Sequence, residues 1–469
     1  MWRRLFDVVL GHKLANLAVV IALIIGFFHG WLKLKVRHPI TTFAFDIPLL
    51  VALALTWVRT GSFSRFFPAG PTRTALGVFY GVVAIWFGLA LVLPWGAPFL
   101  AALAAVRGWV FATLMFGLGY QLIISRRQLH GYFILIIVLS AITSVYAMRQ
   151  SEEEVMAMRA IDPLFELMTR GQTFVDDEGR MILRRFSTFI SSGGFGGTMA
   201  VSLLFLAALL TDRTVGKAEK GLLLGLGLLI GIGMFLSGAR SAVLAFGMGL
   251  VLIVWFRRLP SYLLLLGAAA AVGLWVGSRA TEGGLVDRLA TLEPEVIWSR
   301  FYIVWAPGTR YLVESGFLGG GLGKGGVGLP MSLIQYIGRY EIWGVDGDLG
   351  KTMAELGIVG VGVVFWMLFA GLLQGFRILR ERRNDAVGTM ALGAVCVFGI
   401  AVVLFPTGSP FVGIPLGVLT WFFLGAVIRL NEVEPLGGVR APMLVGDLPA
   451  RRRFLTGGPA VGGPGTGAG

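Results

Sequence analysis

Long runs of hydrophobic residues dominate this sequence, and short polar segments separate them. A helix needs roughly 20 mostly apolar residues to cross the hydrocarbon core of a bilayer. Runs of about this length predict twelve membrane-spanning helices, at 13–32, 42–58, 74–93, 97–125, 131–148, 193–211, 220–236, 241–256, 261–278, 350–374, 386–405 and 411–429. The seventh and eighth are short and closely joined, so a miscount there is the main alternative.

The spans and the polar segments between them define the organisation of the chain. They predict three groups of helices, two long loops and a glycine-rich tail, with boundaries at 1–148, 149–192, 193–278, 279–349, 350–429 and 430–469. We expect the tail to be disordered, because its composition cannot bury a core. The fold class is therefore an all-α polytopic membrane protein of about twelve helices, with its largest loop between helices nine and ten.

Charge beside the spans predicts the orientation of the chain. Cytoplasmic loops of membrane proteins carry an excess of lysine and arginine. With the N-terminus in the cytoplasm every short inner loop is basic, as at Arg126-Arg127 and Arg257-Arg258. An even number of spans returns the C-terminus to the same side, so both long loops face outward.

The two long loops nevertheless hold many arginines, which is compatible with export because long loops cross regardless of charge. They contain a single lysine, Lys324, against Arg149, Arg159, Arg170, Arg180, Arg184, Arg185, Arg279, Arg288, Arg300, Arg310 and Arg339. Solvated surface charge explains most of these, yet the preference for arginine suits bidentate binding of phosphate or carboxylate oxygens. The net charge of +14 is accounted for by the inner loops and does not indicate nucleic-acid binding.

Several common chemistries lack their residues in this chain. Cys396 is the only cysteine and lies in a hydrophobic run, which excludes an intramolecular disulfide. No Cys/His zinc spacing or nucleotide-binding glycine motif occurs. The four histidines all precede the long loops, at His12, His29, His38 and His130. We therefore expect no zinc site, no cofactor and no ATP-driven step.

Ionisable residues lie in or beside several predicted spans. Arg240 ends the short outer hairpin Ser237–Arg240, where a charge is costly unless it is paired or bound to an anion. Snorkelling toward lipid phosphates is the alternative to a clamp on a lipid-linked phosphate. Asp46 and Arg107 fall within predicted spans and either pair with each other or bind substrate. Both options indicate a polar cavity that opens outward.

The large loop contains a predicted amphipathic helix at 295–314, interrupted near Pro307 and Gly308. The helix carries candidates for substrate contact, namely Arg300, Trp305 and Arg310. Aromatic rings in such a helix stack on sugar rings or anchor at the membrane interface. The alternative is a plain interfacial helix with solvated arginines.

Glycines and carboxylates precede the tenth span. Gly316–Gly328 contains eight glycines, which permit close approach of the backbone to a ligand, although a flexible connector has the same composition. Asp346 and Asp348 follow, and such a pair can bind a cation or supply a general base. Helix capping is the alternative for Asp348. Glu355 lies inside the span and needs a partner, for which Lys351 is the local choice.

These segments resemble the bacterial O-antigen ligase and O-antigen polymerase superfamily, the WaaL and Wzy group. The matching motifs come in the order of that family: Arg185 with a glycine-rich turn into the sixth span, the hairpin Ser237–Arg240, Arg300 to Trp305 with the glycine run, and Asp346 to Gly360. The resemblance covers residues 185–365, and the span count and loop placement outside this region also match.

The resemblance implies a GT-C-like glycosyltransferase of the bacterial plasma membrane with an extracytoplasmic site. Members transfer a glycan from a polyprenyl-diphosphate-linked oligosaccharide donor to a glycan or glycolipid acceptor. Carried over to this chain, Arg240 and Arg300 hold the leaving diphosphate and neutralise it without a metal. Asp346 takes the place of the proton acceptor. The substrate-binding candidates are Arg185, Arg310, Asp348, Arg107 and Trp305.

One departure from the family pattern concerns the residue that accepts the proton. Ligases carry a histidine where this chain has Asp346, and the Asn that follows it is Gly347. A carboxylate can accept the proton or orient the sugar hydroxyl instead. The sequence therefore favours a polymerase of glycan repeat units over a ligase. A flippase for lipid-linked glycans and a structural membrane protein are the alternatives from other classes, and long charged outer loops beside short inner ones favour an outward-facing enzyme.

Overall fold

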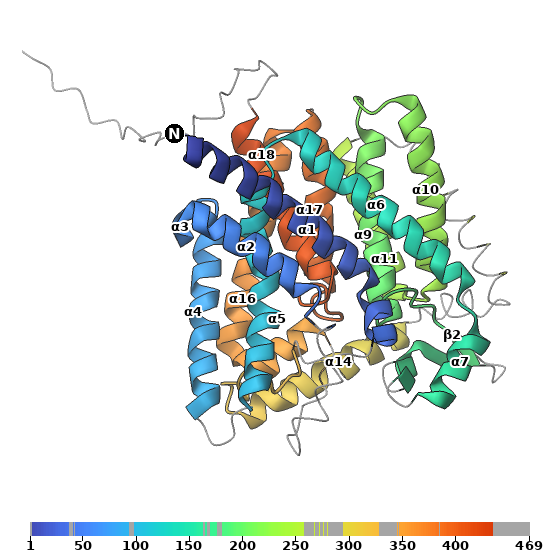
Figure 1. Ribbon diagram of the computed structural model, residues 1–469. Helices are drawn as coiled ribbons and strands as arrows, with labels where there is room; N and C mark the ends of the chain where they lie inside the picture. Colours follow the sequence, from blue (N-terminus) through green and yellow to red (C-terminus); the bar gives the residue numbers. More distant parts are fainter. Residues whose placement is uncertain are drawn as a thin grey trace, which may run out of the picture. The chain divides into compact units, whose positions relative to one another are not determined.

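The hydrophobic runs form helices, as they must where hydrocarbon offers no partner to backbone N–H and C=O groups. The computed structural model (Figure 1) describes residues 2–36, 41, 43–92, 98–162, 165–166, 169–175, 181–257, 267, 272, 275, 279, 294–327, 345, 347–383 and 385–434. For some of these residues only the backbone is described, namely 2–11, 170, 174–175, 294–297 and 299–301. The helices are α1 (Trp2–Val36), α2 (Asp46–Thr60), α3 (Phe63–Phe66), α4 (Pro71–Val92), α5 (Phe99–Leu122), α6 (Arg126–Arg149), α7 (Glu152–Ile161), α9 (Ser192–Thr211), α10 (Lys217–Leu236), α11 (Arg240–Arg257), α14 (Pro294–Glu314), α16 (Asp348–Glu381), α17 (Ala386–Leu404) and α18 (Leu416–Val433).

Ten of the described helices are long and apolar enough to cross a membrane, and we treat the chain as a multi-pass membrane protein. They coincide with ten predicted spans and include the seventh and eighth, which are the separate helices α10 and α11. The second predicted span forms α2, whose 15 residues extend roughly 22 Å, less than the roughly 30 Å of a hydrocarbon core. The ninth predicted span, 261–278, lies outside the described residues except at three isolated positions. The count of twelve stays a prediction.

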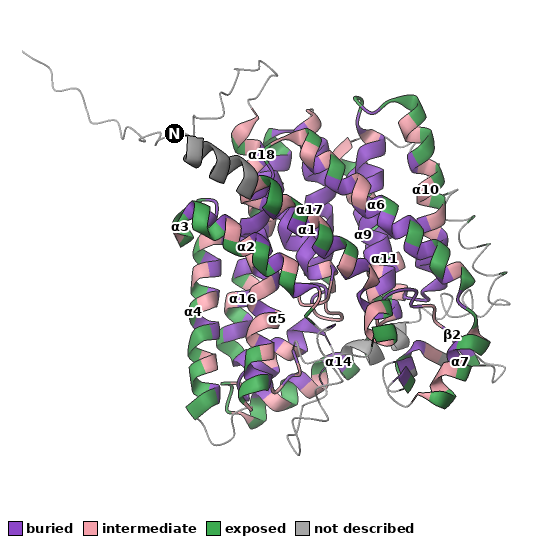
Figure 2. Ribbon diagram, in the orientation of Figure 1, coloured by how far each residue is buried: buried purple, intermediate pink, exposed green. Residues whose placement is uncertain are grey.

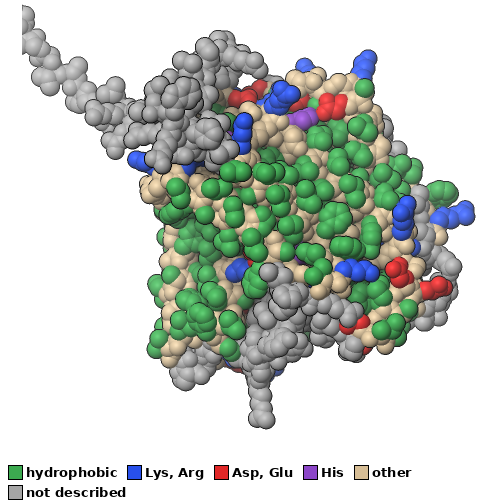
Figure 3. Space-filling view, in the orientation of Figure 1, with side chains coloured by type: hydrophobic (Ala, Val, Ile, Leu, Met, Phe, Trp, Pro, Cys, Tyr) green, Lys and Arg blue, Asp and Glu red, His purple; other side chains and the backbone are tan. Residues whose placement is uncertain are grey.

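Burial separates central helices from peripheral ones. Most residues of α9, α17 and α18 are buried, whereas only about a third of the residues of α4 and α11 are buried (Figure 2). Figure 3 shows hydrophobic side chains covering the middle of one face, with most of the charged side chains above and below them. This arrangement is the one expected of a surface that contacts lipid tails between two polar interfaces.

The helices α5 and α18 pack backbone against backbone. A Cβ atom added at Gly119 would lie 2.0 Å from the carbonyl oxygen of Phe422, and one added at Gly425 would lie 1.9 Å from that of Phe116. Small residues allow such close approach, which matters in a membrane because helices associate there largely through van der Waals packing. The contact joins the first third of the chain to its last described helix.

The first long loop, 149–192, contains regular structure that the sequence had not predicted. Helix α7 begins after Ser151, whose hydroxyl accepts from the N–H of Glu154 and caps the helix. Strands β1 (Thr173–Val175) and β2 (Met181–Leu183) form an antiparallel pair. These elements are too short for the hydrophobic pattern to identify them.

The two ends of the bundle carry different elements. The glycine-loop end holds the glycine loop (316–327), helix α14, the start of α16 and the loop 405–415. Figure 1 shows α14 lying across this end, below α5 and α16. Helix α14 matches the amphipathic helix predicted at 295–314, but it continues through Pro307, so the predicted interruption is wrong. Gly308 lies against Gly350 of α16, and this packing supports the helix where its sequence is weak.

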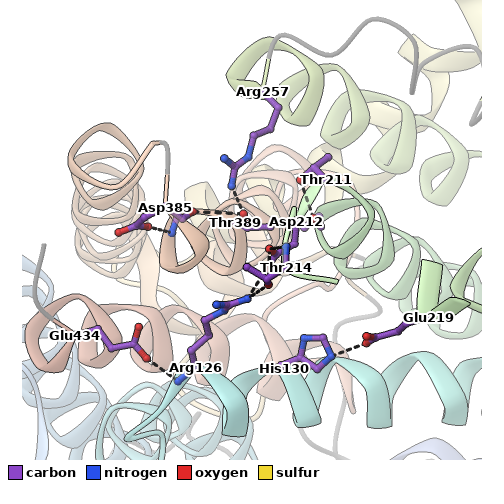
Figure 4. A network of polar contacts seen from close by, with 12 residues as sticks. Arg126, His130, Thr211, Asp212, Thr214, Glu219, Arg257, Asp385, Thr389 and Glu434 are labelled. Carbon is purple, nitrogen blue, oxygen red and sulfur yellow. Dashed lines mark hydrogen bonds and ion pairs between the residues drawn. The ribbon is translucent and has the colours of Figure 1, made fainter. Parts of the chain in front are cut away.

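The opposite end, which we call the basic end, is held together by ion pairs and hydrogen bonds (Figure 4). Arg126 donates to Asp212 at 3.0 Å and ties the start of α6 to the end of α9. Arg257, the last residue of α11, donates to Thr389 near the start of α17. Helix α11 thus ends at the basic end, whereas α14 lies at the glycine-loop end.

Replacement of Gly119 by alanine is expected to destabilise the protein. The added methyl group would overlap the backbone of α18, and such overpacking costs about 1–3 kcal/mol. Gly81→Ala in α4 is the matched control, because a Cβ atom there meets nothing within 4 Å and alanine favours a helix by up to about 1 kcal/mol. Thermal unfolding in detergent compares the two variants. Equal stability would contradict the close α5–α18 contact.

Candidate functional site

Helix α16 is broken two turns after it begins. Gly357 has φ 63° and ψ −162°, a conformation that glycine adopts without the steric cost of a side chain. The glycine loop supplies the backbone partners that the break leaves open. The N–H of Ile358 donates to the carbonyl of Phe317 at 3.0 Å, and the N–H of Gly320 donates to that of Ala354 at 2.7 Å. The glycine run is therefore a docked segment rather than a loose connector.

The glycine loop also packs against two membrane-spanning helices. The indole N–H of Trp86 in α4 donates to the carbonyl of Leu318 at 2.9 Å. At Gly323, where φ is 94°, an added Cβ atom would lie 2.7 Å from the carbonyl carbon of Ala101 in α5. Both the positive φ and the close approach require glycine at this position. The loop is thus wedged among α4, α5 and α16.

Two completely buried carboxylates on α16 each hold a loop. Asp348 Oδ2 accepts from the N–H of Phe411, in the loop 405–415, at 2.8 Å. Glu355 Oε2 accepts from the indole N–H of Trp109 at 2.8 Å, and its Oε1 accepts from the N–H of Val327, in the glycine loop, at 3.2 Å. The first two turns of α16 therefore join both loops of this end.

One expectation about α16 is wrong and another is incomplete. The residue that caps the helix is Gly347, with φ 74°, and Asp348 is the first helical residue, so Asp348 is not a cap. The turn at Gly347 lets the Asp348 side chain reach the loop 405–415 instead of its own helix. Lys351 interacts electrostatically with Glu355, as expected, but its ammonium group donates to Ser409 at 3.0 Å. Glu355 takes its hydrogen bonds from Trp109 and Val327 instead. Local spacing missed these partners because they come from distant segments.

The ion pair between Asp46 and Arg107 is present in the structure. Arg107 donates from Nε to Oδ2 at 2.6 Å and from Nη2 to Oδ1 at 2.9 Å, a bidentate pair between α2 and α5. Asp46 is 5% exposed and Arg107 22% exposed at the side chain. Lys33 of α1 lies close enough to interact electrostatically with both. The substrate-binding role of Arg107 stays a prediction.

Arg185 holds the end of α6. Its Nη1 donates to the carbonyls of Ala147 and Met148 at 3.0 and 2.9 Å, and its backbone N–H donates to the carbonyl of Leu236 at 3.1 Å. Burial lowers the pKa of the guanidinium, as expected of a cation removed from water. Sequence reasoning missed this capping role, which leaves the substrate-binding role of Arg185 as a prediction.

Arg240 is the first residue of α11 and follows the tight turn at Gly238, where φ is 58°. The turn packs on the start of α9, because Gly196 faces Ser237. The next residue of α9, Gly197, faces Leu416 at the start of α18. A continuous series of contacts thus leads from the Arg240 hairpin to the loop 405–415.

Helix α14 carries the remaining candidates. Trp305 donates from its indole N–H to the carbonyl of Pro406 at 3.0 Å, which links α14 to the loop 405–415. Arg310 is exposed and forms an ion pair with Glu314 one turn along the same helix. Arg300 lies on α14, but its side chain and the whole of Asp346 are outside the described residues.

Sequence reasoning missed Trp109 and the loop 405–415 as parts of this site. Trp109 lies in the same hydrophobic run as Arg107, two residues further on, which is a signal that could have singled it out. The loop 405–415 contains the polar turn Pro406–Pro410 between two apolar runs. Among the residues described, no three His, Cys, Asp or Glu side chains gather as metal ligands would.

Four segments that are distant in sequence therefore lie at the same end of the bundle, the glycine-loop end. They are the Arg185 segment, the Arg240 hairpin, helix α14 with the glycine loop, and the start of α16. Cations in such a partly buried setting can bind an anionic group more strongly than they would in water. Comparison with models of protein families and with the sequences of curated proteins finds no significant match to this chain.

Removal of one member of the Asp46–Arg107 pair should lower the free energy of unfolding more than removal of both. A buried charge left without its partner carries the full penalty of desolvation, whereas an apolar pair does not. We expect a coupling free energy of about 0.5–3 kcal/mol from a double-mutant cycle of Asp46→Ala and Arg107→Ala, measured by unfolding in detergent. Additive effects would mean that the pair contributes little.

Proposed function

We propose that this chain is a bacterial membrane glycosyltransferase that acts on a glycan linked to polyprenyl diphosphate. Its preferred reaction is polymerisation of glycan repeat units, as in the Wzy group. The observation that carries the proposal is that the four motif segments lie at one end of the bundle, the glycine-loop end. The resemblance of those segments to the family is what assigns them this chemistry.

The proposed reaction divides the work among three residues. The acceptor hydroxyl attacks the anomeric carbon of the donor, and the bond from that carbon to the diphosphate oxygen breaks. Asp346 receives the proton from the hydroxyl. Arg240 and Arg300 bind the departing diphosphate, because fixed guanidinium groups stabilise the charge that develops on it.

The orientation is part of the proposal. Charged side chains crowd the basic end, including Arg126, Arg257 and Arg382. By the excess of basic residues in cytoplasmic loops, this end faces the cytoplasm of a bacterial plasma membrane, and both termini lie on that side. The glycine-loop end then faces outward, where a GT-C-like enzyme meets its lipid-linked donor.

The ligase alternative differs only in the acceptor. Of the described histidines, His12 and His130 pair with Arg59 and Glu219 toward the basic end, and His29 is buried in α1 beside Phe45.

Purified protein incubated with lipid-linked oligosaccharide separates the classes. Longer glycans indicate a polymerase, glycan on a second lipid indicates a ligase, and neither product favours a flippase or a structural protein.

Replacement of Arg240 or Arg300 by alanine is expected to abolish glycan transfer while the protein still folds. Lysine at either position should restore little activity, because a single ammonium group cannot reproduce bidentate contacts. Arg377→Ala is the matched control, since Arg377 is exposed on the far part of α16. Product formation on gels gives the measurement. Full activity in both alanine variants would reject the diphosphate clamp.

Replacement of Asp346 by asparagine is expected to lower the transfer rate by about 10²–10⁴-fold, the usual cost of losing a general base. The change keeps the size of the side chain and removes its ability to accept a proton. Initial rates at saturating donor give the measurement. An unchanged rate would assign Asp346 a structural role instead.

A further inference from the structure

Glu355 is completely buried, and both of its oxygens accept hydrogen bonds. Trp109 of α5 donates to one oxygen and the backbone of Val327 donates to the other. The carboxyl group also interacts with the backbone N–H of Gly323. Each of these partners is an N–H donor, so the surroundings are built for a group that only accepts.

Neither an amide nor a hydrocarbon can replace this group. Glutamine has the same shape, but it offers one acceptor oxygen and one NH2 donor. Its NH2 would face either the indole N–H of Trp109 or the backbone N–H of Val327. A buried donor left without an acceptor costs as much as its lost hydration. The carboxylate is therefore a specific requirement of this position.

The hydrogen bond to Val327 is an anchor at the far end of the glycine loop. The near end is held by backbone bonds at Phe317 and Gly320 and by Trp86. Between these attachments the loop packs on α5 at Gly323, and its glycines with positive φ, Gly321, Gly323 and Gly326, contribute no side chains to hold it. In the sequence, the glycine loop precedes the segment that carries the proposed base, Asp346.

We propose that Glu355 is a positioning residue. It fixes the far end of the glycine loop against α16 and α5, so that the four motif segments keep their relative positions. The inference rests on the transferase function proposed above. Glu355 touches no reacting atom in this scheme and acts through the loop backbone.

The loop itself can be tested without any transfer assay. A single reporter thiol is introduced as Lys324→Cys in a Cys396→Ala background, since Lys324 is half-buried in the loop and Cys396 is buried. The rate of maleimide labelling in lipid nanodiscs then reports how often the loop leaves its seat. We expect Glu355→Gln to raise this rate about tenfold, as loss of a buried hydrogen bond implies. Glu355→Asp should raise it less, because both oxygens remain acceptors.

Two further variants control for effects other than the loss of this hydrogen bond. Glu381→Gln makes the same chemical change at an exposed position of the same helix, and its labelling rate should equal that of the parent. Trp109→Phe removes one hydrogen-bond donor to Glu355 and keeps an aromatic ring, so it should raise the labelling rate by a smaller factor. It tests the anchor even if Glu355→Gln fails to fold. An unchanged labelling rate in both Glu355→Gln and Trp109→Phe would overturn the anchor.

The transfer assay then decides whether the anchor serves the reaction. Glu355→Gln should lower kcat about 10–100-fold, since displacement of about 1 Å in a site can cost 10²-fold, with a smaller change in KM. Glu355→Asp should recover part of the loss. Faster labelling with unchanged kcat would overturn the positioning role. If the parent protein transfers no glycan, the proposed function fails, while the labelling result still establishes the loop anchor.

Discussion

Backbone groups that leave a helix inside a membrane protein must be paired there, because hydrocarbon cannot pair them. Helix α16 meets this requirement at Gly357, where peptide groups of the glycine loop replace the interrupted helical bonds. The loop is consequently drawn into the bundle rather than left in water. Helix α14 ends just before the loop begins, so the break in α16 also determines where α14 lies.

Buried carboxylates extend this dependence to other parts of the chain. Asp348 holds the loop before α18, Glu355 holds the glycine loop and α5, and Asp46 joins α2 to α5. A buried polar group is costly when its partner is missing, so each of these contacts penalises alternative arrangements. The glycine-loop end is thereby specified by polar contacts, whereas the middle of the bundle is specified by packing.

The sequence predicts the parts of this fold that depend on local pattern. Hydrophobic length identified ten spans, and helical periodicity identified α14. Prediction from local pattern failed where distant residues decide the outcome, as at Glu355, whose partner Trp109 is 246 positions away. Helix α14 likewise continues through Pro307, where Gly308 packs against the distant residue Gly350. The ion pair of Asp46 and Arg107 was one of two alternatives that the sequence left open, because two opposite charges in apolar runs have few other partners.

The contact between α5 and α18 has a consequence for biosynthesis. Gly119 emerges from the ribosome some 300 residues before its partner Gly425, so α5 enters the lipid with its glycine face unmatched. Helices inserted early must then wait in the bilayer, shielded by lipid or by an insertion factor, until the last span arrives. Completion of the bundle is therefore a late, post-insertion event, in keeping with the slow formation of contacts between distant segments.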